Sequence, residues 1–184
     1  MQATIQNEAM RLGRMINGMV ELATEGGVVN RQKIDFAVML KTCAQNTRLV
    51  LEQKGNSFNV EIAPDLPYVY AEAEALTRVP INLFANAANS TKNGEVTLKA
   101  TADKSYITVQ IIDTGEGISA DIFPHVFERG VSEKGGKGFG LAICKTIIEA
   151  HGGTIDIESE TGIGTTVTFT IPVYGGQSEV AKRE

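Results

Sequence analysis

The feature that most constrains the fold is an apolar, β-branched run that ends in a carboxylate followed by two glycines. Residues 106–112 place Ile, Val and Ile at alternate positions, which predicts a β-strand with one buried face. Asp113 follows at the end of this strand, where it is held in place and can still accept a hydrogen bond. Gly115 and Gly117 can adopt positive φ and let a flat group lie against the backbone. Alone, this Asp-x-Gly-x-Gly pattern is equally typical of an ordinary turn, so its meaning depends on the rest of the chain.

The composition favours a packed domain over a disordered chain. The 184 residues are 42% hydrophobic and 21% charged, which suits one domain of ordinary size, or one domain with an appendage. The net charge of −5 gives no general support for nucleic-acid binding, so we expect no nucleic-acid partner. Cys43 and Cys144 are expected to be buried free thiols in a reducing compartment. No cysteine–histidine spacing suits zinc, and the apolar runs fall short of the roughly 18 residues of a membrane span. We therefore expect a soluble chain and a piece of something larger.

Residues 1–24 are predicted to form a separate helix. Apolar residues recur there at steps of three and four, and Gly26-Gly27 then acts as a linker. Two interpretations stay open: a helix docked on its own domain, or half of a helical hairpin that dimerises. The residues that form the stripe are Ile5, Ala9, Leu12, Ile16, Met19 and Ala23.

The remaining chain alternates predicted strands and helices. Residues 118–139 lack clear periodicity, and a stretch of this length inside a compact domain is typical of a functional lid. Residues 175–184 are predicted to be a frayed tail. The expected strands are 33–36, 58–62, 68–70, 154–158 and 165–171, with a hairpin over 94–112, and the expected helices are 37–53, 72–91 and 141–150.

Several sequence features together indicate a nucleotide site. The Asp113 carboxylate can accept a hydrogen bond from an exocyclic amine, and the glycine turn lets a base approach. Glycine-rich residues 135–140 precede a predicted helix, whose free backbone N–H groups suit phosphates. Asn82 and Asn86 lie four residues apart on one helix face, and an amide oxygen suits a hard cation such as magnesium.

The common phosphate-binding motifs do not match. A P-loop would need a glycine where Val131 stands and a serine or threonine where Gly138 follows Lys137. The dinucleotide fingerprint would need its glycines directly after a strand, whereas here they follow the predicted lid.

The order of the motifs resembles the catalytic domain of the sensor histidine kinases. Residues 82–87 (Asn-Leu-Phe-Ala-Asn-Ala) resemble the N box, and 113–117 (Asp-Thr-Gly-Glu-Gly) resemble the G1 box. Residues 123–127 resemble the F box and 138–142 (Gly-Phe-Gly-Leu-Ala) the G2 box. Residues 151–153 and 164–166 match the segments that usually follow, so that the resemblance covers about 33–173.

This resemblance implies an α+β fold, the Bergerat ATP-binding sandwich that gyrase and Hsp90 share. It is a two-layer sandwich, with a mixed sheet covered by helices on one face and the nucleotide between a helix and the lid. In this chain it would be preceded by one N-terminal helix. The implied division is residues 1–25 as the second helix of a truncated dimerisation and phosphoacceptor hairpin, 26–174 as the catalytic domain, and 175–184 as a tail.

The resemblance also implies roles for individual residues, with ATP and Mg²⁺ as cofactors. Asp113 would bind the adenine amine with help from Thr165, and Gly115 and Gly117 would make room for the base. Asn86 would hold magnesium. Asn89 stands where the family commonly has lysine or histidine. The residues expected near the phosphates are Asn82, Asn89, Lys134, Gly138, Gly140 and Leu141.

The N box favours phosphotransfer over hydrolysis. The hydrolytic branches of the superfamily carry a glutamate general base where this chain has Asn82, and an amide cannot accept the proton. His125 and His151 both lack the context of a phosphoacceptor, so we expect the acceptor histidine to lie outside this chain.

The resemblance implies that the γ-phosphate passes to a histidine on a dimerisation helix and then to the receiver domain of a response regulator. The full-length kinase is expected to be a homodimer. We expect a cytoplasmic domain, with membrane anchoring of the full-length protein left open. Two alternatives also stay open, a GHKL-type ATPase and a scaffold that only binds nucleotide.

Overall fold

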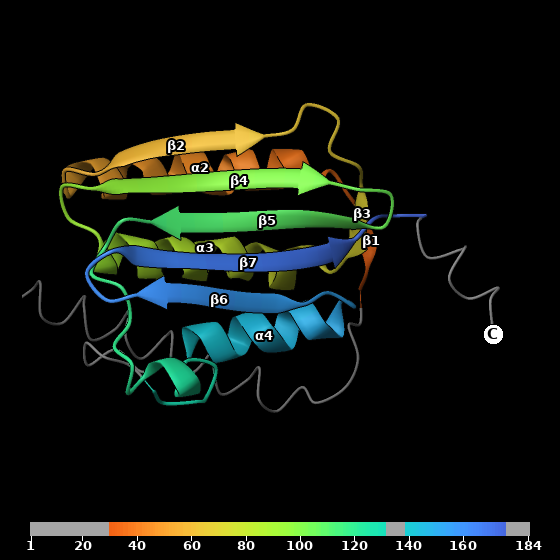
Figure 1. Ribbon diagram of the computed structural model, residues 1–184. Coiled ribbons are helices and arrows are strands. Elements are labelled where there is room, and N and C mark those ends of the chain that lie inside the picture. The colour runs from red at the N-terminus through yellow and green to blue at the C-terminus, as the bar shows by residue number, and fades with distance from the viewer. Residues whose placement is uncertain (1–29, 132–138, 176–184) are drawn as a thin grey trace, which may run out of the picture.

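The computed structural model describes residues 30–131 and 139–175 (Figure 1). The helix predicted over residues 1–24, the glycine-rich end of the predicted lid, and the tail from residue 176 lie outside the described residues. Within the described part of the chain, no helix combines the length and apolar character needed to cross a membrane.

A five-stranded mixed sheet forms one layer of the molecule, in the order β2-β4-β5-β7-β6 (Figure 1). The pair β2–β4 is parallel, and the other neighbouring pairs are antiparallel. The strands are β2 (Ser57–Ile62), β4 (Glu95–Ala102), β5 (Tyr106–Asp113), β6 (Ile155–Glu160) and β7 (Gly164–Pro172).

Helices cover one face of this sheet and form the second layer, as Figure 1 shows for the helices behind and below the strands. They are α2 (Phe36–Gln53), α3 (Ala73–Ser90) and α4 (Gly140–Ala150), with a short 3₁₀ turn η1 at Phe123–His125. A two-stranded sheet of β1 (Gln32–Ile34) and β3 (Val69–Ala71) lies at the end of the sandwich away from the tip of β5. The predicted two-layer fold with helices on one face is confirmed.

The core lies between the layers because alternate residues of each central strand face the helices. Along β5, Ile107, Val109 and Ile111 are fully or almost fully buried, and Phe169 and Ile171 of β7 lie beside them. Phe84 of α3 meets Phe58 of β2 edge to face, with ring centroids 5.4 Å apart. The opposite face of the sheet carries polar side chains, among them Thr97, Thr108, Thr166, Thr168 and Thr170.

Within the described residues, the predicted boundaries are right to within two residues, with one error of type at Phe36. The strand was expected to run through residue 36, but β1 ends at Ile34. Asp35 accepts a hydrogen bond from the Val38 N–H at 3.0 Å and begins α2 as its N-cap. Phe36 is completely buried as the first residue of that helix, so a capping side chain and a buried ring decide its conformation.

Pro80 lies inside α3, beyond the first turn, and the helix continues through it. Its ring is buried, and its missing N–H removes the usual donor to the Leu76 carbonyl. Packing against the sheet and α4 therefore maintains a helix that local propensity disfavours.

The start of β7 offers a test of this architecture. Gly164 has a φ of +146°, and a Cβ there would overlap the Asp113 carbonyl oxygen of the paired strand. We expect Gly164→Ala to lower the free energy of unfolding by roughly 3 kcal/mol or more, as measured by urea denaturation. Gly162→Ala is the matched control: φ there is +81° and a Cβ would meet no described atom within 4 Å, so the cost should be about 1 kcal/mol. Equal costs at the two sites would contradict the close approach of β7 to Asp113.

Candidate nucleotide-binding site

Asp113 is a buried carboxylate at the tip of β5, paired across the sheet with Val96 and Thr165. Its exposure is 8%, and its Oδ1 accepts a hydrogen bond from the Gly115 N–H at 2.9 Å. Burial raises the pKa of Asp113, and hydrogen bonding by the Gly115 N–H, Thr91, Ser90 and the Thr165 backbone opposes this shift. The result is a buried acceptor surrounded by several donors.

The two glycines of the turn are required by contacts within the protein. A Cβ on Gly115 would lie 2.6 Å from the Ser90 carbonyl oxygen. Gly117 has a φ of +70°, and a Cβ there would overlap the Glu160 carbonyl oxygen. Both glycines let neighbouring backbone close over the turn, and their expected role in making room for a base stays a prediction.

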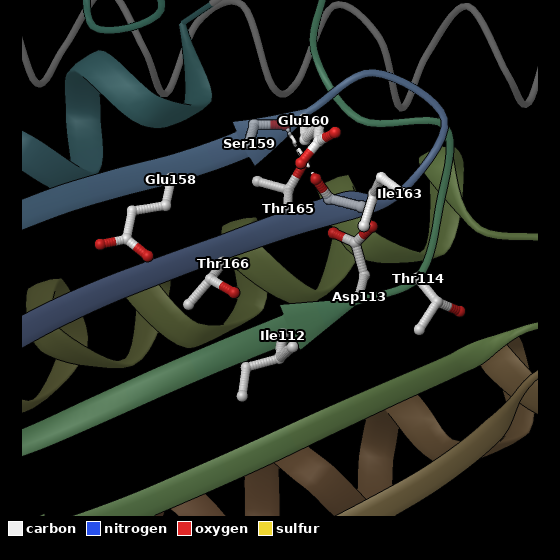
Figure 2. A pocket seen from close by; sticks show the side chains of 10 residues that line it. Ile112, Asp113, Thr114, Glu158, Ser159, Glu160, Ile163, Thr165 and Thr166 are labelled. Carbon is white, nitrogen blue, oxygen red and sulfur yellow. Dashed lines mark hydrogen bonds between the residues drawn. The ribbon is translucent and has the colours of Figure 1, made fainter.

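Thr165 lies beside Asp113 in a network of hydroxyl groups centred on Ser159 (Figure 2). The Ser159 hydroxyl accepts from the Ile118 N–H at 2.9 Å and reaches the Gly164 carbonyl at 3.0 Å. The Ser159 hydroxyl has a single proton, and the Gly164 carbonyl can only accept it. When Ser159 donates to Gly164, the Thr165 hydroxyl must therefore be the donor in its 2.9 Å contact with Ser159. The Thr165 oxygen then retains lone pairs, and it lines the same hollow of about 390 Å³ as Asp113.

The asparagines of α3 lie in different surroundings along the helix. Asn82 is half-buried beside the Cys144 thiol of α4. That thiol donates to the Val79 carbonyl of α3 at 3.8 Å, and burial raises its pKa to about 12. Asn86 is exposed one turn later. Asn89 is also exposed, and its Oδ1 accepts from the Lys54 ammonium at 3.1 Å, so a contact with phosphate would compete with Lys54.

The amino end of α4 begins at Gly140, and no described side chain caps it. A Cβ on Gly140 would meet no described atom within 4 Å. The first backbone N–H groups of α4 have no partner within the helix itself. Leu141 packs its side chain against the core. Lys134 and Gly138 lie outside the described residues.

The structure thus brings together some of the predicted residues and separates others. Asp113 and Thr165 share one hollow, and Asn89 and Gly115 line a second one of about 260 Å³. Asn82 and Asn86 line neither hollow. Both lie on α3, before the helix ends at Ser90.

Sequence reasoning missed the hydroxyl groups that surround Asp113. Ser90 and Thr91 follow the predicted asparagines directly, and Ser159 comes from a distant strand. A hydroxyl carries no recognisable pattern by itself, so only the packing of α3 against β5, and the pairing of β6 with β7 beside it, reveal these residues.

Both histidines of the chain have structural partners. His151 is 4% exposed, its Nε2 accepts from the Glu72 N–H at 3.1 Å, and its Nδ1 faces the Ile147 carbonyl at 2.7 Å. Since a backbone N–H must donate and a carbonyl must accept, this pair of contacts fits the neutral ring protonated at Nδ1. His125 is exposed, and its Nδ1 lies 2.7 Å from Glu128 Oε1.

Comparison with known families and proteins gives consistent results. The profile described as histidine kinase-, DNA gyrase B- and HSP90-like ATPase matches residues 71–175, more than half of the chain. Sensor histidine kinase ZraS of Escherichia coli is 32% identical over 90% of this chain and 36% of its own length. Adaptive-response sensory kinase SasA of Synechococcus elongatus is 31% identical over 92% of this chain and 46% of its own length. The chain therefore spans less than half of these relatives.

Solved structures agree with this assignment. Full-length ShkA, described as a complex with AMPPNP, superposes with a TM-score of 0.81 at 25% identity, over 93% of this chain and 38% of ShkA. The mycobacterial sensor histidine kinase MprB gives a TM-score of 0.69 at 25% identity, over 78% of this chain and 98% of that one. The chain therefore belongs to the histidine kinase-, DNA gyrase B- and HSP90-like ATPase family, and it contains an ATP-binding catalytic domain of the sensor histidine kinase type.

Proposed function

We propose that this chain binds ATP with Mg²⁺ and transfers the γ-phosphate to a histidine on the dimerisation helix of a sensor kinase. The observation that carries the proposal is Asp113, a buried carboxylate held by donors at the tip of β5. A buried charge is costly, and the donors around it leave an acceptor suited to an exocyclic amine.

The nucleotide is proposed to lie along the second half of α3. The adenine amine would meet Asp113, with Thr165 beside it and Gly115 and Gly117 lining the turn. Magnesium, held by the exposed amide of Asn86, would neutralise phosphate charge. The residues proposed near the phosphates are Asn82, Asn89, Lys134, Gly138, Gly140 and Leu141.

Two features support phosphate binding at that end. Among the described residues, no side chain caps the amino end of α4 and no atom crowds Gly140, so the first N–H groups and the helix dipole favour anions there. The Cys144 thiol of the same helix lies beside Asn82 and donates to the Val79 carbonyl at 3.8 Å, which is a direct contact between α3 and α4.

Phosphotransfer is favoured over hydrolysis because Asn82 offers no base. Its amide lies beside the neutral Cys144 thiol and cannot take a proton from water. An ATPase or a nucleotide-binding scaffold would be the outcome if phosphate release, or binding without transfer, were found instead.

The remaining parts of the proposal concern the full-length kinase. We place residues 1–25 in the second helix of a dimerisation hairpin, 26–174 in the catalytic domain and 175–184 in a tail. The partners are the histidine-bearing helix of the same kinase, which acts as a homodimer, and the receiver domain of a response regulator. The catalytic domain would work in the cytoplasm.

The first prediction concerns binding through Asp113. We expect Asp113→Asn to weaken ATP binding in the presence of magnesium by at least about tenfold, because a charge-assisted hydrogen bond is lost. Titration calorimetry would measure the affinity, with phosphate release followed in parallel and expected to be negligible. Asp103→Asn is the control, since Asp103 is an exposed residue at the other end of β5 and accepts from Ser105 and Tyr106. Unchanged affinity in Asp113→Asn would exclude this base site.

The second prediction concerns the cost of the same charge to stability. Burial raises the pKa of Asp113, so its favourable contribution is complete below the unfolded-state pKa and is lost as pH rises through the folded-state pKa. Without nucleotide, Asp113→Asn should therefore raise the melting temperature at pH 7 by about 2–4 °C, the effect of roughly 1 kcal/mol in a domain of this size. The gain should shrink below about pH 4, where the carboxyl is protonated in both states. A lower melting temperature at pH 7 would show that the charge stabilises the fold.

The third prediction separates magnesium from the base. Asn86→Ala should reduce ATP affinity about three- to tenfold with magnesium and should have little effect in excess chelator, because only the metal contact is lost. Asn46→Ala, an exposed asparagine on α2, is the matched control. Equal weakening with and without magnesium would mean that Asn86 does not hold the metal.

A further inference from the structure

Lys54 places a positive charge against the end of α3. It follows α2 directly and is half-buried, and its ammonium donates to two acceptors of the neighbouring helix. One is the Ala88 carbonyl, and the other is Asn89 Oδ1 at 3.1 Å. Both acceptors are neutral, and the carboxylate two residues earlier, Glu52, pairs with Arg48 at 3.5 Å. Neither contact of Lys54 therefore neutralises its charge.

The backbone of Lys54 is fixed relative to this helix end. Its carbonyl accepts from the Asn93 N–H at 3.2 Å. The Asn56 side chain, which is 4% exposed, donates to the Thr91 carbonyl and accepts from the Gly94 N–H, both at 3.0 Å. The segment after α2 is thus joined to the segment after α3, and the Lys54 ammonium moves only by rotation of its own side chain.

The Asn89 side chain connects this ammonium to the proposed nucleotide site. Asn89 lines the same hollow of about 260 Å³ as Gly115, which follows Asp113 by two residues. Asn89 is one of the residues proposed near the phosphates. The Lys54 ammonium, in contact with its amide oxygen, therefore lies one side chain away from them.

The described residues proposed near the phosphates supply no cation. Three are amides, one is apolar and one has no side chain: Asn82, Asn86, Asn89, Leu141 and Gly140. A nucleoside triphosphate keeps a net negative charge after one Mg²⁺ has bound. A hydrogen bond from an ammonium to a phosphate oxygen is also stronger than one to a neutral amide, because donor and acceptor are both charged.

A purely structural role would use the same contacts. A lysine that bonds the last carbonyls of a helix also meets the negative end of the helix dipole. Lys54 would then stabilise the end of α3 and would not distinguish a ligand with phosphates from one without them. This difference in ligand preference separates the two roles.

We propose that Lys54 is a phosphate-binding residue of the nucleotide site, which supplies from the end of α2 the charge that the asparagines of α3 lack. This inference rests on the proposed ATP site. The ammonium has three donors, of which Ala88 and Asn89 take two. A phosphate oxygen takes the third, or replaces the Asn89 amide as the stronger acceptor, while the Ala88 carbonyl keeps the ammonium in place.

Lys54→Gln tests the charge, because glutamine keeps a donor for the Ala88 carbonyl. ATP affinity in the presence of magnesium should fall about tenfold. Adenosine carries the same base without phosphates, so its affinity should stay at the wild-type value. NMR titration of the backbone amides measures both affinities, weak ones included. Lys54→Arg keeps the charge and should lose clearly less ATP affinity than Lys54→Gln.

Two other lysines serve as matched controls for the loss of one positive charge. Lys92→Gln removes a charge that lines the hollow beside Asn89, but there the carboxylate of Glu116 also lines the hollow. Lys104→Gln removes an exposed charge from the turn before β5, at the end of that strand away from Asp113. Each should change ATP affinity less than about threefold. Lys54→Met is the second variant if glutamine disturbs folding, which the melting temperature reports.

Asn89→Ala separates direct contact from an indirect effect. If Lys54 acted only by holding the Asn89 amide, the double variant would bind ATP no more weakly than Asn89→Ala alone. We expect Lys54→Gln to cause a further loss of about fivefold or more in the Asn89→Ala background.

Several outcomes would overturn the inference while wild-type ATP binding stands. They are unchanged ATP affinity in Lys54→Gln, equal weakening of adenosine and ATP, an equal loss in Lys54→Arg, no further loss in the Asn89→Ala background, or a larger effect of Lys92→Gln. A wild type that binds neither ATP nor adenosine would overturn the proposed function, and this inference with it. The two failures are therefore distinguished by the wild type alone.

Discussion

The structure of the site depends on one buried carboxylate at the end of a central strand. Asp113 is held by β7 on one side and by the end of α3 on the other, so sheet pairing and helix packing meet at this residue. Burial makes the charge costly, and the surrounding donors make it tolerable. Burying this carboxylate therefore lowers the stability of the domain, a cost that is typical of sites kept for binding a ligand.

The rest of the domain brings the neighbours of Asp113 into place. The mixed sheet is covered on one face, and α3 crosses that face so that its last turn reaches the tip of β5. Glycines at 115, 117 and 164 remove the side chains that would otherwise keep neighbouring backbone away. Asn56 then fixes the chain where it leaves α3. The two-stranded sheet of β1 and β3 lies at the far end, away from these contacts.

Much of the fold could be read from periodicity, because alternation and helical spacing report which face each element buries. The hairpin of β4 and β5 and the helix α4 lie close to where the sequence predicts them. Phe36 was placed in the wrong element because a cap at Asp35 and complete burial override local propensity. Pro80 was difficult for the same reason, since packing and not propensity keeps α3 intact.

The sequence by itself determined the class of the protein and singled out Asp113 as the carboxylate proposed to bind the base. Ordered motifs, a strand that ends in Asp113 and paired asparagines are local patterns, so they are visible before folding. Only the tertiary structure decided which groups surround that carboxylate, because Thr91, Ser159 and Thr165 come from separate segments and carry ordinary hydroxyls. It also decided that Asn82 meets a buried thiol and that Asn89 meets Lys54. Such contacts depend on which segments pack together, and packing is a property of the whole fold.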